Sequence, residues 1–153
     1  MRPFMLFILA GAALAQAPTS QAPATPAPAP LPPNPFLKSV GTMSELMIEV
    51  IFPTSNEIFY VSRNPEKTPK DWEELRTNAL MLAESANLLM ASNRAKDQDQ
   101  WMKDANLLWD VGNRAFKFAK AKDYEGLKAL NDDLYEACQS CHVHYRPGYR
   151  RKL

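Results

Sequence analysis

The chain contains little of what β-sheet, disulfide-rich or nucleic-acid-binding proteins need. It has 5 glycines in 153 residues, and no stretch alternates apolar and polar residues as a half-buried strand does. Two cysteines are too few for a disulfide framework. Its 18 basic and 17 acidic residues nearly cancel, which argues against nucleic acid as a partner. These absences indicate an all-α protein in which the two cysteines must be explained together.

Both cysteines belong to the segment Cys138-Gln139-Ser140-Cys141-His142. Two thiols three residues apart project from one turn of a helix, and the histidine follows the first cysteine by four residues, on the same face. C-x-x-C-H is the attachment sequence for c-type haem, in which the thiols add to two vinyl groups and the histidine binds iron. The spacing therefore predicts one covalent haem c on Cys138 and Cys141, with His142 as an axial ligand.

Three other interpretations of the motif compete with haem. A thioredoxin-like dithiol would need a βαβ pattern beside C-x-x-C, and the chain has none. A disulfide would leave His142 without a role. A zinc site could recruit His144, but Cys141, His142 and His144 are crowded for tetrahedral ligation from one segment.

The N-terminus has the composition of a signal peptide. Arg2 precedes an apolar run over residues 4–15, which is too short for a comfortable transmembrane helix. Ala13-Leu14-Ala15 is an A-x-A cleavage site. We therefore expect a signal peptide over 1–15 and a periplasmic protein with no stable membrane insertion after cleavage. The alternative is an uncleaved anchor, which also leaves the folded part outside the cytoplasm.

Prolines concentrate just after this site. Residues 17–35 hold eight of the thirteen prolines, a composition that cannot bury an apolar face and predicts a disordered linker over 16–35. Removing residues 1–15 takes away only Arg2 and leaves 17 basic and 17 acidic residues. Residues 36–153 are long enough for one small domain.

Apolar residues in this domain recur at helical spacing in four stretches, approximately 37–62, 69–92, 99–121 and 124–145. Pro53 should kink or interrupt the first, because it has no N–H to donate. Thr68 and Asp123 are expected to cap the second and fourth. Short connections predict antiparallel neighbours, and hence an up-down-up-down four-helix bundle with the haem on the C-terminal helix.

The expected core faces follow from the same spacing. They comprise Val40, Met43, Met47, Val50 and Ile51; Trp72, Leu75, Ala79, Leu82, Ala86 and Leu89; Trp101, Ala105, Leu108, Gly112 and Ala115; and Leu127, Leu130, Leu134, Cys138, Cys141 and Tyr145.

A C-terminal C-x-x-C-H on the last of four helices resembles the cytochrome c-prime superfamily, the class II c-type cytochromes. The specific part is the motif followed by x-x-Y-R, which ends here at Tyr145 and Arg146. The resemblance implies that these two residues pack at the haem edge. Leu46-Met47, with Pro53 six residues after Met47, is similar to the methionine-ligated branch. It implies Met47 as the distal axial ligand, with Met43 as the alternative.

The function expected from this resemblance is electron transfer without substrate chemistry, so the protein is not expected to be an enzyme. Its partners would be other periplasmic redox proteins, and a homodimer is an open alternative to a monomer. A rival interpretation is a five-coordinate cytochrome c-prime-like protein that binds a small gas such as nitric oxide. A second rival is a structural or zinc-binding bundle without haem.

Overall fold

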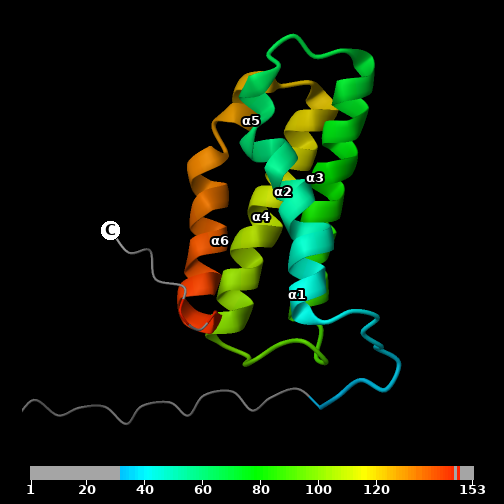
Figure 1. Ribbon diagram of the computed structural model, residues 1–153, viewed down its shortest axis with the longest axis vertical. Coiled ribbons are helices and arrows are strands. Elements are labelled where there is room, and N and C mark those ends of the chain that lie inside the picture. Colours follow the sequence, from blue (N-terminus) through cyan, green and yellow to red (C-terminus); the bar gives the residue numbers. More distant parts are fainter. Residues whose placement is uncertain (1–31, 147, 149–153) are drawn as a thin grey trace, which may run out of the picture.

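The computed structural model describes residues 32–146 and residue 148, and these residues form helices and no strand. The expected signal peptide and linker lie outside the described residues, apart from residues 32–35. Four helical stretches lie side by side along the long axis, as a helical bundle requires (Figure 1). The α3–α4 connection lies at one end, and the connections from α2 to α3 and from α4 to α5 lie at the other (Figure 1).

The first stretch comprises α1 (Met43–Glu45), a π-helix (Leu46–Ile51), α2 (Phe52–Phe59) and a 3-10 turn (Val61–Arg63). It begins at residue 43 because Thr42 forms a capping box, in which its hydroxyl accepts from the Glu45 N–H and Glu45 Oε2 accepts from the Thr42 N–H. The expected start near residue 37 is therefore wrong. Val40 precedes the cap and is fully exposed, so its place in the core stripe is wrong as well.

The π-helix explains how the chain accommodates Pro53. The Phe52 N–H donates to the carbonyl of Met47, five residues back, instead of the usual four. The α-helix then restarts with proline at its first turn, where a missing N–H costs nothing. The expected interruption at Pro53 is confirmed, and it takes the form of one widened turn that contains Met47.

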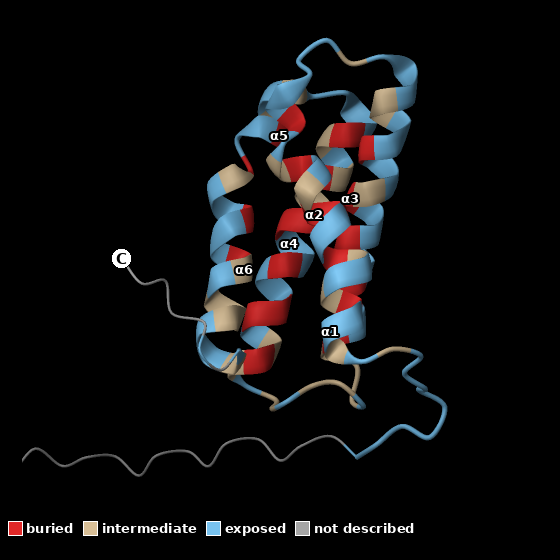
Figure 2. Cartoon of the chain, viewed as in Figure 1, coloured by how far each residue is buried: buried red, intermediate tan, exposed pale blue. Residues whose placement is uncertain are grey.

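Helices α3 (Pro69–Met90) and α4 (Gln100–Ala121) form the centre of the fold. Thr68 begins α3 with a second capping box, as expected, and its hydroxyl accepts from the Asp71 N–H. The two helices approach closely where Gly112 faces the backbone of Ala83. The predicted core residues of both helices are buried, except that Trp72 is only partly buried (Figure 2).

The last stretch is divided into α5 (Tyr124–Lys128) and α6 (Asn131–Tyr145), whereas one helix over 124–145 was expected. Asp123 caps α5 as expected, since its carboxylate accepts from the Gly126 N–H at 2.9 Å. Between the helices the Leu130 N–H donates to the carbonyl of Leu127, three residues back. This tighter turn leaves both leucines fully buried.

The loop between α3 and α4 holds the segment that leads into α1. Ser92 Oγ accepts from the Asn34 N–H at 3.2 Å, Asn93 donates to Ser39 Oγ at 2.7 Å, and Arg94 donates to the Gly41 carbonyl. None of the helices in the described residues has the length and apolar character needed to cross a bilayer.

Candidate functional site

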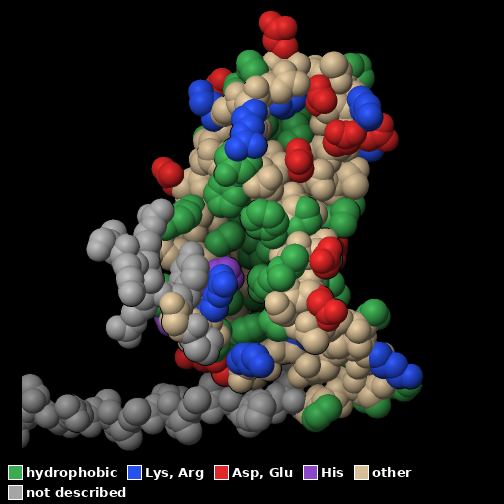
Figure 3. Space-filling view, viewed as in Figure 1, with side chains coloured by type: hydrophobic (Ala, Val, Ile, Leu, Met, Phe, Trp, Pro, Cys, Tyr) green, Lys and Arg blue, Asp and Glu red, His purple; other side chains and the backbone are tan. Residues whose placement is uncertain are grey.

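Two adjoining cavities form a groove between α6 and the first helical stretch. The apolar cavity has a volume of about 390 Å³ and extends toward Phe59 and Leu108. The loop-side cavity has a volume of about 330 Å³ and extends toward Lys96 and Trp101. Residues that line both are Met47, Ile48, Cys141, His142 and Arg146. Hydrophobic side chains surround the hollow, with Lys, Arg and His side chains near it (Figure 3).

Helix α6 brings both cysteines to the groove. Cys138 lines the apolar cavity, Cys141 lines both cavities, and neither thiol is in a disulfide. Burial raises the pKa of each thiol to about 11, and the charge of Asp104 adds to the effect on Cys141. The thiols are therefore protonated near neutral pH. Deprotonating them for a zinc ion would cost additional free energy.

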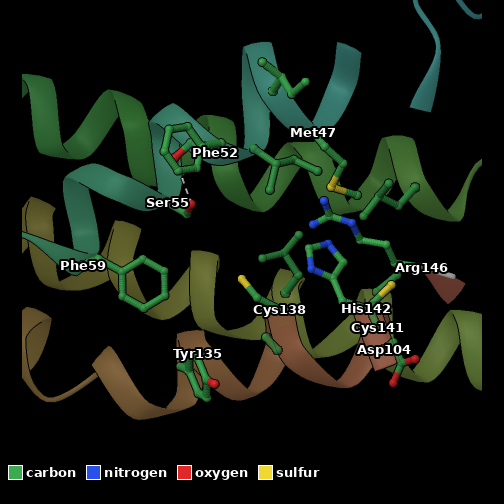
Figure 4. A pocket seen from close by; sticks show the side chains of 16 residues that line it. Met47, Phe52, Ser55, Phe59, Asp104, Tyr135, Cys138, Cys141, His142 and Arg146 are labelled. Carbon is green, nitrogen blue, oxygen red and sulfur yellow. Dashed lines mark hydrogen bonds between the residues drawn. The ribbon is translucent and has the colours of Figure 1, made fainter. Parts of the chain in front are cut away.

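His142 follows on the same side of α6 and lines both cavities (Figure 4). Its imidazole is half-buried. Burial, together with the charge of Arg146, lowers the pKa of His142 below its usual value. The imidazole is therefore neutral near neutral pH, which is the form that binds a metal.

Met47 faces these groups from the opposite wall. Figure 4 shows its side chain extending from the first helical stretch toward His142 and Arg146. Met47 lines both cavities, whereas Met43 lines only the loop-side one. Its place in the π-helix is notable, because such turns occur frequently at functional sites. Of the two candidate sulfurs, Met47 thus has the more central position in the groove.

Arg146 and Tyr145 occupy different surroundings at the end of α6. Arg146 lines both cavities. Tyr145 lines the loop-side cavity, but its hydroxyl donates to Asp97 in the α3–α4 loop, and its ring meets that of Trp101 edge-on at 4.9 Å. Burial and this hydrogen bond raise the pKa of Tyr145. Tyr145 therefore joins the motif to the loop.

A cluster of Asp104, Gln100, Ser140 and His144, here called the Asp104 cluster, was not predicted from the sequence. Asp104 is 1% exposed. Its Oδ1 accepts from Ser140 Oγ at 2.6 Å and from Gln100 Nε2 at 3.0 Å, and its Oδ2 lies 2.9 Å from His144 Nδ1. Burial raises the pKa of Asp104, but these contacts outweigh it and leave the pKa lowered.

A signal for this cluster exists in the sequence. Asp104 follows Trp101 by three residues and precedes Leu108 by four, so it lies in the apolar stripe of α4. An aspartate at such a position requires hydrogen-bond donors from a neighbouring helix. Ser140 and His144, one helical turn apart in the motif region, provide them. His144 is itself exposed apart from this contact.

No protein-family model, curated protein or solved structure matches the chain. Among the described residues, no group of three or more His, Cys, Asp and Glu side chains is placed to hold a metal ion. The zinc interpretation therefore finds no support there. A haem does not need such a group, because the porphyrin itself supplies most of the ligands of the iron.

Proposed function

We propose that this chain is an exported mono-haem c-type cytochrome that acts in electron transfer. Haem c would be attached to Cys138 and Cys141, in an antiparallel up-down-up-down bundle of the cytochrome c-prime type. One observation carries the proposal: both thiols and the imidazole of a single C-x-x-C-H motif line one groove, with a methionine opposite.

The groove fits a flat, largely apolar cofactor. Each cavity has a volume in the range of about 300–1,000 Å³ that is typical of small-molecule sites. Ile51, Leu108 and Ala137 contribute apolar walls, and both cysteines are free for thioether formation. The placement of the inter-helix connections at alternating ends supports the antiparallel order of the bundle (Figure 1).

Each residue that lines the groove would have a separate role at the proposed haem site. His142, as a neutral imidazole, would bind the iron on one side, and Met47 would bind it on the other, with Met43 as the alternative. Bound haem supplies a centre that gains and loses one electron. The apolar walls would exclude water from the bound haem, and Arg146, which lines both cavities, would supply a positive charge at its edge. Thioether ligation would raise the reduction potential.

The proposal is tested by expressing the full chain in a host with haem c maturation machinery. We expect one haem per chain that survives denaturing gel electrophoresis, recovered from the periplasm with residues 1–15 removed. The variant Cys138→Ala/Cys141→Ala should lose covalent haem, and wild-type chain made without the machinery is the matched control. Full haem staining of the double variant would refute the assignment.

Optical and EPR spectra of the same preparation separate electron transfer from gas binding. A low-spin ferric haem that resists carbon monoxide is expected if a methionine occupies the sixth position. A high-spin haem that binds carbon monoxide readily would replace electron transfer with the gas-binding function.

A further inference from the structure

Asp104 presents a physical problem, because it is the one charged side chain among the fully buried residues of the described chain. A buried carboxylate is costly, and replacing buried ionic groups by apolar ones is often neutral or stabilising. Its partners are nevertheless specific. Two of its three donors, Ser140 and His144, belong to α6, and Ser140 lies inside the C-x-x-C-H motif.

The residues that contact Asp104 and the residues that line the groove lie on different sides of α6. Residues of an α-helix advance by about 100° each, so Cys138, Cys141 and His142 share one side of α6, and Ser140 and His144 share another. The first side lines the groove. The second side meets Asp104 on α4. The contacts of Asp104 thus tie the Ser140 and His144 side of α6 to α4, while the cysteine side lines the groove.

We propose that Asp104 is the positioning residue of the attachment motif. Its carboxylate holds α6 against α4 so that both thiols and His142 face the groove, and it maintains a negative charge beside Cys141 that lowers the reduction potential of the attached haem. This inference rests on the proposed function.

The charge is placed where it can act on a bound cofactor. Asp104 lines the apolar cavity together with Cys138, Cys141 and His142. Water screens this charge less than it screens a surface charge, because the side chain is 1% exposed. The same charge contributes to the raised pKa of the Cys141 thiol. A negative charge in these surroundings stabilises ferric over ferrous iron.

The test compares Asp104→Asn with Asp132→Asn, which removes the same charge from an exposed position on α6. Purified holoproteins are titrated with dithionite and redox mediators at one and the same pH. Asp104→Asn should raise the midpoint potential by about 59 mV, a tenfold change for one electron, and Asp132→Asn should shift it far less. Equal potentials for the two variants would overturn the charge effect.

Positioning is measured separately, as covalent haem per chain. Ser140→Ala removes the donor at 2.6 Å and leaves the carboxylate in place, so this ratio should fall, and Ser140→Thr should restore it. This pair also tests the inference if Asp104→Asn does not accumulate. An unchanged ratio in Ser140→Ala overturns the positioning role. Wild-type protein without haem would instead refute the proposed function itself.

Discussion

Replacing Gly112 by alanine tests the close approach of α3 to α4, the helix that carries Asp104. A Cβ added at Gly112 would lie 2.7 Å from the Ala83 nitrogen and 2.8 Å from its Cα. Ordinary contacts between such atoms are about 3.5–4.0 Å, so the helices would have to separate by about 1 Å. These are backbone atoms, which cannot rotate away as a side chain would.

Two opposing effects set the size of the change. Alanine gains about 0.8–1.0 kcal/mol over glycine in a helix interior. Overpacking of a core typically costs about 1–3 kcal/mol, and a backbone clash belongs to the upper part of that range. We therefore expect Gly112→Ala to lower the free energy of unfolding by about 1–2 kcal/mol, despite the better helix propensity.

Urea denaturation of the purified protein, followed by circular dichroism, measures this difference. Gly41→Ala is the control, because its added Cβ would come no closer than 3.4 Å to the atoms around it, and those atoms belong to the exposed side chain of Glu45. The control should be closer to wild type. If Gly112→Ala is as stable as wild type with an unchanged denaturant slope, the packing of α3 on α4 described above is incorrect.

The remaining predictions concern the proposed iron ligand, two ionisable groups and the contribution of the proposed haem to folding. Met47→Leu should turn the ferric iron high-spin and open it to carbon monoxide, whereas Met43→Leu should not; the reverse pattern in optical and EPR spectra would assign the ligand to Met43. The pKa of Asp104 is lowered in the folded protein, so the ionised carboxylate stabilises the fold above its free pKa of about 3.9. This stabilisation is lost as the pH falls below that value, and Asp104→Asn should flatten the acid part of a plot of Tm against pH. The pKa of Tyr145 is raised, so the protonated hydroxyl stabilises the fold below its free pKa of about 10, and this stabilisation is lost as the pH rises past that value. Tyr145→Phe should flatten the alkaline part of the same plot of Tm against pH. A decline as steep as that of the wild type in this variant would contradict the assignment. The double cysteine variant without haem should melt without cooperativity, because its groove is unfilled, and a sharp calorimetric transition would show that the bundle does not need haem.

The sequence predicted the central helices well because their apolar residues repeat with one period over six turns. On α3, Leu75, Ala79, Leu82, Ala86 and Leu89 all prove to be buried. Thr68 and Asp123 were also identifiable, since a side-chain oxygen before an apolar periodic stretch is a strong start signal. Where local preference and tertiary packing agree, the sequence is sufficient.

It was insufficient where packing selects among local alternatives. Pro53 predicts an interruption but does not say whether the chain forms a kink, a break or the π-helix observed at Leu46–Ile51. The turn between α5 and α6 contains neither glycine nor proline, so nothing in the sequence marks it. The Asp104 cluster joins residues 36 and 40 positions apart, and periodicity on one helix cannot locate partners on another.

The residues between and after the two cysteines also influence how α6 packs against α4. If only haem attachment constrained α6, Ser140 and His144 could be any residues, since the attachment sequence requires only the cysteines and the adjacent histidine. Both instead donate to one buried carboxylate. A shift of α6 by one residue would turn it by about 100°, moving the thiols out of the groove and leaving Asp104 without its donors. An unpaired buried charge is far more costly than a lost surface contact. The hydrogen bonds of Ser140 and His144 to Asp104 therefore strongly oppose such a shift, and they help to keep the cysteines turned toward the groove.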